Sequence, residues 1–356
     1  MRIILANPRG FCAGVHMAID VVDQILDLCP DQTIYVFHEI VHNKHVVNRF
    51  KDRGVVFVED VDDVPEGSIL VFSAHGISPA VREQARRRNL TAVDATCPLV
   101  TKVHSEAIRY AKQGYDILLI GHADHQEVQG TLGEAPQNIQ VVESPEDIAS
   151  LNIHDAARVA YLTQTTLSTD DAGVIIEAIK QAIPTIKEPP SSDICYATTN
   201  RQAAVRQIAP ECDLVLVVGS KNSSNSVRLT EISANVGVPA YLLDDVSELR
   251  DEWFEQVNGG NGHGGDLTVL VTAGASAPED LVAELCRTLI SRYGGTIEQR
   301  DVFNEDVEFG LPATLKRLMR DRGVDPEGRR IRVGNYDLTE ESYGAVPLTV
   351  AGKPVG

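Results

Sequence analysis

Three cysteines occur in similar local sequences, each directly before a segment with a helical pattern of apolar residues. They are Cys12 in RGFCAG, Cys97 in DATCPLV and Cys195 in SDICYATTN, at intervals of roughly 90 residues. A helix N-terminus carries free N–H groups and a partial positive charge, both of which stabilise a thiolate. One cysteine in such a turn would most simply be a small residue, but three at repeated positions favour a cradle for a metal–sulfur core.

The number of these cysteines indicates the kind of metal site. A closed structural zinc site takes four ligands, and iron–sulfur clusters usually have four cysteine ligands. A four-iron cluster held by three cysteines keeps one iron open, and this iron can act as a Lewis acid while the cluster stores electrons. The remaining cysteines, Cys29, Cys212 and Cys286, lie in apolar segments or at a helix end, and we interpret them as packing residues.

Two polar turns follow each cysteine turn, and each comes after a β-rich run. The first of them lies about 30 residues after its cysteine. The polar side chains of these turns are His42, His75, His125, Thr165, Ser223, Ser224, Asn225 and Ser276. One histidine alone would more often be structural, but imidazole, hydroxyl and amide donors on matched turns favour a site for an anion such as a diphosphate. Glu127 is either a proton donor at this pocket or a side chain that complements a helix dipole.

β-rich runs alternate with amphipathic segments along most of the chain. The runs are RIILA, TIYVF, SILVFSA, YDILLIG, RVAYLTQ, DLVLVVGS and LTVLVTAG. Continuous apolar strands that alternate with helices predict parallel sheets covered on both faces. Because binding loops of open α/β sheets follow the strands, three such units around one axis would bring all these turns to one centre. Similar βα units would also give similar spacings by chance, which is the alternative explanation of the repeat.

We therefore predict an α/β fold of three similar α/β units with small, mostly parallel sheets around a pseudo-threefold axis and a central cluster site. The predicted units are residues 1–96, 97–194 and 195–315. Residues 316–356 are locally basic and then rich in Gly and Pro. We expect this C-terminal tail to drape over the surface or to be partly disordered. The Gly-rich stretch 259–265 is expected to be a surface insertion.

The composition narrows the class of protein. Of the 356 residues, 43% are hydrophobic and 23% are charged, which is typical of a globular protein. The formal net charge of −19 argues against nonspecific nucleic-acid binding. No apolar stretch approaches the roughly 20 residues of a membrane span, and the N-terminus lacks the pattern of a signal peptide. We therefore expect a cytoplasmic protein that binds neither nucleic acid nor membrane and whose six cysteines form no structural disulfides.

Eight motifs of the chain together resemble those of one known enzyme family. They are ANPRGFCAGV, HEIVHNKHVV, FSAHG, DATCPLVTKVH, TQTTLS, DICYATTNRQ, VVGSKNSSNS and VTAGASAP. Through these long, ordered motifs the chain is similar to the 4-hydroxy-3-methylbut-2-enyl diphosphate reductase family from residue 1 to about 315. This family carries out the last step of the methylerythritol phosphate route to isoprenoids.

The resemblance implies a role for each residue of the cysteine and polar turns. Cys12, Cys97 and Cys195 would ligate a four-iron, four-sulfur (4Fe-4S) cluster with one open iron. The implied diphosphate contacts are His42, His75, His125, Ser223, Ser224, Asn225 and Ser276. Glu127 matches the essential acid of the family, and Thr165 matches its substrate-side threonine.

The implied reaction is the reductive dehydroxylation of (E)-4-hydroxy-3-methylbut-2-enyl diphosphate to isopentenyl diphosphate and dimethylallyl diphosphate. Two electrons arrive singly from a donor such as ferredoxin or flavodoxin, and Glu127 with Thr165 relays the proton that lets water leave. Two alternatives stay open on the residues alone, a zinc-dependent hydrolase of a phosphorylated substrate and a non-catalytic iron–sulfur sensor of isoprenoid diphosphates. The absence of tight zinc-ligand spacing weighs against the first, and a proton relay would serve no purpose in the second.

Two positions depart from the family pattern. The usual HPEV reads HQEV here, so Gln126 replaces a proline, and this change predicts a looser turn around His125 and Glu127. His16 stands on the first predicted helix, where an acidic residue is usual. The Gly-rich stretch and the C-terminal tail have no counterpart in the family motifs.

Overall fold

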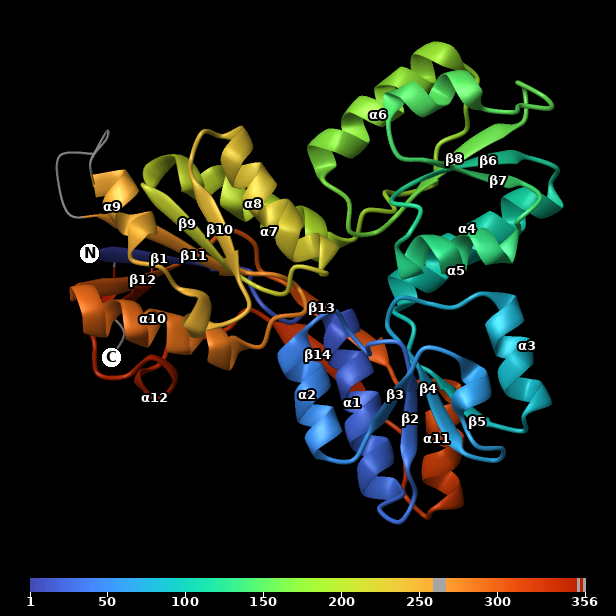
Figure 1. The fold of residues 1–356 in the computed structure, drawn as a ribbon, viewed down its shortest axis with the longest axis horizontal. Helices are drawn as coiled ribbons and strands as arrows, with labels where there is room; N and C mark the ends of the chain where they lie inside the picture. Colours follow the sequence, from blue (N-terminus) through green and yellow to red (C-terminus); the bar gives the residue numbers. More distant parts are fainter. Residues whose placement is uncertain (259–266, 351–352, 355–356) are drawn as a thin grey trace.

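Three mainly parallel β-sheets, each packed against helices, form three lobes around a common centre (Figure 1). The computed structural model describes residues 1–258, 267–350 and 353–354. Continuous apolar strands need cover on both faces, and the alternating helices provide it. The predicted α/β class with small, mostly parallel sheets is therefore confirmed. Within the described ranges, every helix is too short or too polar to span a bilayer.

The first lobe contains a parallel sheet with the strand order β3–β2–β4–β5. Its strands are β2 (Ile34–Phe37), β3 (Val56–Val58), β4 (Ile69–Phe72) and β5 (Thr91–Asp94). Its helices are α1 (Ala13–Leu28), α2 (Lys44–Asp52), the short η1 (Val61–Asp63) and α3 (Pro79–Arg87). The apolar face of α1, with Val22 and Ile25, packs against Ile34 and Val36 of β2.

The second lobe contains a parallel sheet with the order β7–β6–β8. Its strands are β6 (Asp116–Ile120), β7 (Ile139–Val142) and β8 (Val159–Thr163), and its helices are α4 (Pro98–Lys112), α5 (Gln126–Glu134), η2 (Pro145–Ser150) and α6 (Thr169–Ala182). Beside β8, the backbone N–H of Lys187 donates to the carbonyl of Val159, at 2.8 Å, and the N–H of Tyr161 donates to the carbonyl of Lys187, at 3.1 Å. The chain around Lys187 therefore occupies the place of a fourth strand.

The third lobe contains the largest sheet, with the order β10–β9–β11–β1–β12–β15–β16, in which only β16 is antiparallel to its neighbour. Its strands are β1 (Arg2–Asn7), β9 (Leu214–Val218), β10 (Ala240–Leu243), β11 (Thr268–Ala273), β12 (Thr296–Asp301), β15 (Leu348–Val350) and β16 (Lys353–Pro354). Its helices are α7 (Tyr196–Ile208), η3 (Ala209–Glu211), α8 (Ser224–Asn235), η4 (Val246–Glu248), α9 (Glu252–Asn258), α10 (Glu279–Tyr293) and α12 (Glu340–Tyr343). The N-terminal strand thus lies in the middle of a sheet built mainly from the last third of the chain (Figure 1).

One strand arrangement recurs in all three sheets. The orders β3–β2–β4, β7–β6–β8 and β10–β9–β11 have the same connectivity, since the first strand in sequence lies in the middle each time. A fourth segment lies beside the third strand in every case, namely β5, the chain at Lys187, and β1. Because β1 takes this place in the third sheet, the N-terminal strand completes the repeated four-segment arrangement there.

The predicted division at residues 96, 194 and 315 stays a prediction, and two segments cross its limits. One is β1, which pairs with β11 and β12. The other is α11 (Ala313–Asp321), which buries Leu315 and Met319 in the core of the first lobe and connects the antiparallel pair of strands β13 (Asp306–Gly310) and β14 (Arg330–Gly334). The C-terminal tail therefore contributes helices and strands to two lobes. The Gly-rich stretch 259–265 lies outside the described residues.

The place of β1 can be tested by unfolding the third lobe. Leu5 and Trp253, the single tryptophan of the chain, share one apolar core. We expect Leu5→Ala to lower the free energy of unfolding followed by tryptophan fluorescence by about 2–5 kcal/mol, since a fully buried side chain is lost. Val56→Ala on β3, where the side chain is 40% exposed, is the control and should leave this transition in place. An unchanged transition in Leu5→Ala would contradict the assignment of β1 to the third lobe.

Candidate active site

The three cysteines lie where the chain passes from one lobe to the next. Cys12 follows β1 of the third lobe and is the N-cap of α1 in the first. Cys97 follows β5 of the first lobe and is the N-cap of α4 in the second. Cys195 follows the chain at Lys187 of the second lobe and is the N-cap of α7 in the third. All three sulfurs are therefore held near the meeting point of the lobes, at helix N-termini as predicted.

These junctions surround one cavity with a volume of about 100 Å³. All twelve residues predicted for the site line it: Cys12, His42, His75, Cys97, His125, Glu127, Thr165, Cys195, Ser223, Ser224, Asn225 and Ser276. They come from all three lobes, and some of them, such as Cys12 and Ser276, lie far apart in the sequence. The structure thus brings the cysteine turns and the polar turns to one centre, as the repeat predicted.

The cysteine side chains are packed too closely to be ordinary surface thiols. A methyl group placed on Gly14 would lie 2.5 Å from Sγ of Cys97 and 4.0 Å from Sγ of Cys12, so only glycine fits between them. Burial, followed by the charge of Cys12, raises the pKa of the Cys97 and Cys195 thiols, to about 11 for Cys195. Three such sulfurs can be thiolates together only beside a strongly cationic group, which is what a metal core provides.

The ligand arrangement distinguishes between kinds of metal centre. In the part of the chain that the structure describes, no three His, Cys, Asp or Glu side chains converge on a point where one metal ion would bind. A single zinc ion with a tight ligand set is therefore a poor fit. A polynuclear iron–sulfur core, which is wider than one ion and is bound by thiolates, fits three cysteines that line a common cavity.

Glu127 and Thr165 form a buried pair at the wall of the cavity. The backbone N–H of Thr165 donates to Oε1 of Glu127 at 2.6 Å, and the Thr165 hydroxyl lies 3.0 Å from Oε2. Glu127 is only 3% exposed. Burial raises the pKa of its carboxyl to about 7, although the two hydrogen bonds from Thr165 act in the opposite direction. This carboxyl therefore exchanges its proton near neutral pH, which an acid–base group requires.

Three histidines form an aromatic cluster in the cavity. The rings of His42 and His75 are stacked with centroids 3.9 Å apart, and His125 stands edge-on at 5.5 Å and 6.1 Å from them. Burial and the neighbouring rings lower the pKa of His75 well below its usual value and that of His125 to about 4. His75 and His125 are therefore neutral at pH 7 and act as dipolar donors, while a bound anion would favour their protonation.

The turn of His125 is held by a hydrogen bond from the chain to the histidine side chain. His125 is the N-cap of α5, and its Nδ1 accepts a hydrogen bond from the backbone N–H of Glu127 at 3.1 Å. This bond places the ring proton on Nε2 and ties the histidine to the acid. Gln126 occupies the first helical position, and the looser turn predicted from HQEV stays a prediction. His16 packs edge-on against Phe11 and does not line the cavity.

The start of α8 supplies hydroxyl and amide groups to the same cavity. Ser223 is the N-cap of α8, and its hydroxyl accepts from the backbone N–H of Ser226. The Ser276 hydroxyl donates to the carbonyl of His42 at 2.9 Å, and the Ser224 hydroxyl donates to the carbonyl of Thr166 at 2.9 Å. These contacts join the third lobe to the first and the second. The positions of the hydroxyl and amide groups in the cavity therefore depend on all three lobes.

Thr198 is a site residue that our reading of the sequence missed. Its Oγ1 lies 3.2 Å from Sγ of Cys195 and accepts a hydrogen bond from Nδ2 of Asn225 at 3.1 Å. At this distance the threonine hydroxyl can donate to the sulfur once Cys195 is a thiolate. The i+3 spacing from an N-cap cysteine was the available signal, since a side chain one turn along a helix can contact the capping residue.

Comparison with known proteins places the chain in a family. The family described as LytB protein matches residues 3–290. The 4-hydroxy-3-methylbut-2-enyl diphosphate reductases of Acidothermus cellulolyticus and Rhodopirellula baltica are each 50% identical to the chain, over 94% and 91% of it and over 95% and 98% of their own lengths. The solved structure of the E-1-hydroxy-2-methyl-but-2-enyl-4-diphosphate reductase from Plasmodium falciparum matches 90% of this chain and 98% of its own with a TM-score of 0.85 at 41% identity.

The fold and the site define a three-lobed α/β enzyme whose cysteine-lined cavity also carries a buried acid and a set of imidazole, hydroxyl and amide groups. The chain belongs to the LytB family of 4-hydroxy-3-methylbut-2-enyl diphosphate reductases. These are iron–sulfur oxidoreductases at the last step of the non-mevalonate pathway, where they form isopentenyl diphosphate and dimethylallyl diphosphate. The predicted family and the predicted reductase function are thereby confirmed, and neither the zinc hydrolase nor the sensor is supported.

The pKa of Glu127 can be tested in the protein without ligands. We expect Thr165→Val to raise it above about 7, because the hydroxyl that stabilises the carboxylate is removed while the backbone N–H stays. A carboxyl is protonated below its pKa, so the infrared band of the protonated form, identified by its loss in Glu127→Gln, should persist to higher pH. Thr163→Val is the matched control, because the Thr163 hydroxyl has no hydrogen-bond partner in the described part of the chain. A titration midpoint that stays in place or falls in Thr165→Val would contradict the assignment.

Proposed function

We propose that Cys12, Cys97 and Cys195 hold a four-iron, four-sulfur cluster with one open iron, at which this chain reduces (E)-4-hydroxy-3-methylbut-2-enyl diphosphate. The observation that carries this proposal is the position of one cysteine at each junction between lobes, around a cavity that also contains Glu127. When bound, the cluster supplies electrons one at a time and a Lewis-acidic iron. All other steps depend on the protein's own side chains.

The diphosphate is bound by the three histidines and the start of α8. His42, His75 and His125 offer imidazole donors, and Ser223, Ser224, Asn225 and Ser276 offer hydroxyl and amide groups beside the positive end of a helix dipole. The protein carries a net charge of −19. Local dipoles and protons taken up by the histidines must therefore overcome an unfavourable overall field.

Glu127 and Thr165 move the proton that lets water leave. The backbone N–H of Thr165 fixes Oε1 as an acceptor, so the proton of the neutral acid sits on Oε2, which faces the threonine hydroxyl. Thr165 can then accept this proton and donate its own to the departing hydroxyl group of the substrate. Hydroxide is a poor leaving group, and this transfer turns it into water. Two electrons and a second proton complete the reduction of the allyl group to either isomer.

A protein that transfers one electron at a time, such as a ferredoxin or flavodoxin, supplies the two electrons. A cluster that accepts single electrons requires a donor of the same kind. The diphosphate substrate itself carries no reducing equivalents. The redox chemistry of the cluster therefore determines the class of the electron-donor protein. The residues that line the cavity act only on the substrate.

The close approach of the cysteines can be tested at Gly14. In Gly14→Ala the new Cβ would meet Cys97, so α1 or α4 must shift. We expect the iron and sulfide content per chain after anaerobic reconstitution to fall several-fold. Gly173→Ala on α6 is the matched control, since a Cβ there meets no heavy atom within 4 Å, and it should load normally. Full loading of Gly14→Ala would show that the sulfurs of Cys12 and Cys97 do not need this spacing.

The role of the acid can be separated from binding. Glu127→Gln retains an acceptor for the N–H of Thr165 but has no proton to give. We expect it to bind inorganic diphosphate as the wild type does and to lose turnover by about 100-fold or more, with both isomers measured anaerobically with a strong one-electron donor. A parallel loss of diphosphate affinity would instead make Glu127 a structural residue.

A further inference from the structure

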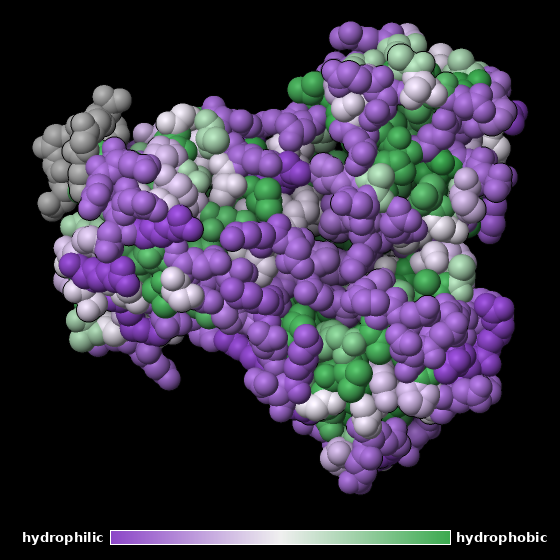
Figure 2. Space-filling model, viewed as in Figure 1, coloured by the Kyte–Doolittle hydropathy of each residue, from purple (hydrophilic) through white to green (hydrophobic). Residues whose placement is uncertain are grey.

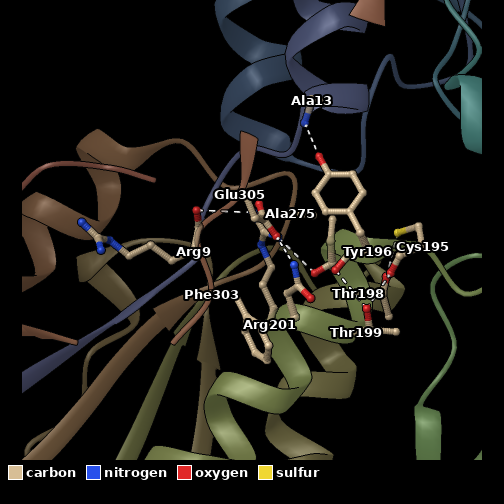
Figure 3. Close-up of polar contacts among 12 residues, drawn as sticks. Arg9, Ala13, Cys195, Tyr196, Thr198, Thr199, Arg201, Ala275, Phe303 and Glu305 are labelled. Carbon is tan, nitrogen blue, oxygen red and sulfur yellow. Dashed lines mark hydrogen bonds and ion pairs between the residues drawn. The ribbon is translucent and has the colours of Figure 1, made fainter. Parts of the chain in front are cut away.

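A buried ion pair lies behind Cys12, outside the cavity. Arg201 on α7 and Glu305, just before β13, are 1% and 4% exposed. Nη1 of Arg201 lies 3.2 Å and 3.4 Å from the two carboxylate oxygens, and Nδ2 of Asn200 donates to Oε1 of Glu305 at 3.0 Å. Figure 3 shows the guanidinium and the carboxylate directed toward each other between α7 and the N-terminal segment.

The same guanidinium holds the loop that leads to Cys12. Nη2 of Arg201 donates to the carbonyl of Gly10 at 2.8 Å and approaches that of Arg9 at 3.5 Å. Nη1 also donates to the carbonyl of Ala197, one turn earlier on α7. Because α7 begins at Cys195, one side chain connects the backbone before Cys12 to the helix that carries another proposed ligand.

The backbone on the other side of Cys12 is held from the same helix. The N–H of Ala13 donates to the hydroxyl of Tyr196 at 3.0 Å (Figure 3), and the N–H of Cys12 itself donates to the carbonyl of Ala275 at 3.1 Å. Residues on both sides of Cys12 are therefore fixed to α7. The two carbonyls bound by Arg201 have no freedom to rotate without breaking a buried charge-assisted hydrogen bond.

A buried ion pair joins two segments at a high desolvation free energy. Removing both charges from water is unfavourable, and well-packed apolar side chains in the same place often stabilise a protein equally well or better. Here the expense is greater, since Nε of Arg201 has no hydrogen-bond partner among the described residues. A role that requires charge explains the pair better than packing does.

We propose that Arg201 and Glu305 are a positioning pair that fixes the Cys12 loop and whose opposite charges set the reduction potential of the cluster. This inference rests on the proposed function, because it takes Cys12 as a ligand. Adding an electron makes the cluster more negative, so a nearby buried cation favours reduction and a nearby anion opposes it. Both charges lie close to the Cys12 loop, because the guanidinium that donates to the carbonyl of Gly10, two residues before Cys12, also contacts the carboxylate of Glu305.

Charge-neutralising variants should shift the potential in opposite directions. Glu305→Gln keeps the shape of the side chain and leaves Arg201 uncompensated, so we expect a higher reduction potential than in the wild type. Arg201→Met leaves the carboxylate uncompensated, so we expect a lower one. The measurement is a redox titration of the anaerobically reconstituted protein, followed by electron paramagnetic resonance without substrate, together with iron content. If Arg201→Met does not fold, the sign of the shift in Glu305→Gln decides alone.

Arg300→Met is the control for a charge lost from the same lobe. Arg300 pairs with Glu211 at 2.8 Å and with Glu298 at 3.1 Å and does not line the cavity, so the reduction potential of the cluster in this variant should stay close to the wild type. A purely structural pair would lower iron content in both variants without shifts of opposite sign, and that result would overturn the inference. Failure of the wild-type protein to bind any cluster would instead overturn the proposed function.

Discussion

The structure depends on how the chain passes from one lobe to the next. At each passage a segment pairs with the third strand of one sheet, ends in a cysteine, and continues as a helix that packs on the following sheet. The carboxyl ends of parallel strands and the amino ends of the next helices meet at the same place. Three such passages therefore converge, and any residues placed on them must face a common centre. The cavity, the acid and the anion pocket all follow from this connectivity.

The convergence creates an electrostatic problem that the side chains must solve. The cavity contains three half-buried thiols, a buried carboxyl and two neutral histidines, His75 and His125, inside a protein of net charge −19. Figure 2 shows one face of the molecule, which is mainly hydrophilic with apolar patches between the hydrophilic areas. Burial keeps Glu127 able to hold a proton near pH 7 and keeps His75 and His125 uncharged until an anion arrives. A cationic metal core is the missing charge that would make three thiolates stable together.

Much of the site could be predicted from local sequence. Each cysteine precedes a helix start, and Pro98 marks one of them clearly, so the N-cap positions of Cys12, Cys97 and Cys195 follow from short-range rules. The repeated spacing then indicates that the three turns share one centre. Thr198 follows the same local logic through its i+3 spacing from Cys195, whereas Gly14, which leaves space for a sulfur, has no distinctive sequence signal.

The rest could not be predicted because it depends on contacts between distant segments. Strand pairing is non-local, so nothing in RIILA shows that β1 lies between β11 and β12. The weak pattern of the C-terminal segment gave no sign of α11, whose apolar residues Leu315 and Met319 are buried by contact with the first lobe. Arg201 and Glu305 are about a hundred residues apart, and a charged residue read in sequence is expected at the surface.

The central claim is that three cysteines, one from each passage between lobes, ligate a four-iron cluster and leave one iron without a protein ligand. Mössbauer spectroscopy of protein reconstituted anaerobically with ⁵⁷Fe tests it most directly, because it separates irons with different ligands. The account predicts three irons of similar character and one that differs, and only the latter should change when the substrate is added. Four equivalent irons, or a fourth thiolate signal that the substrate leaves unchanged, would contradict it.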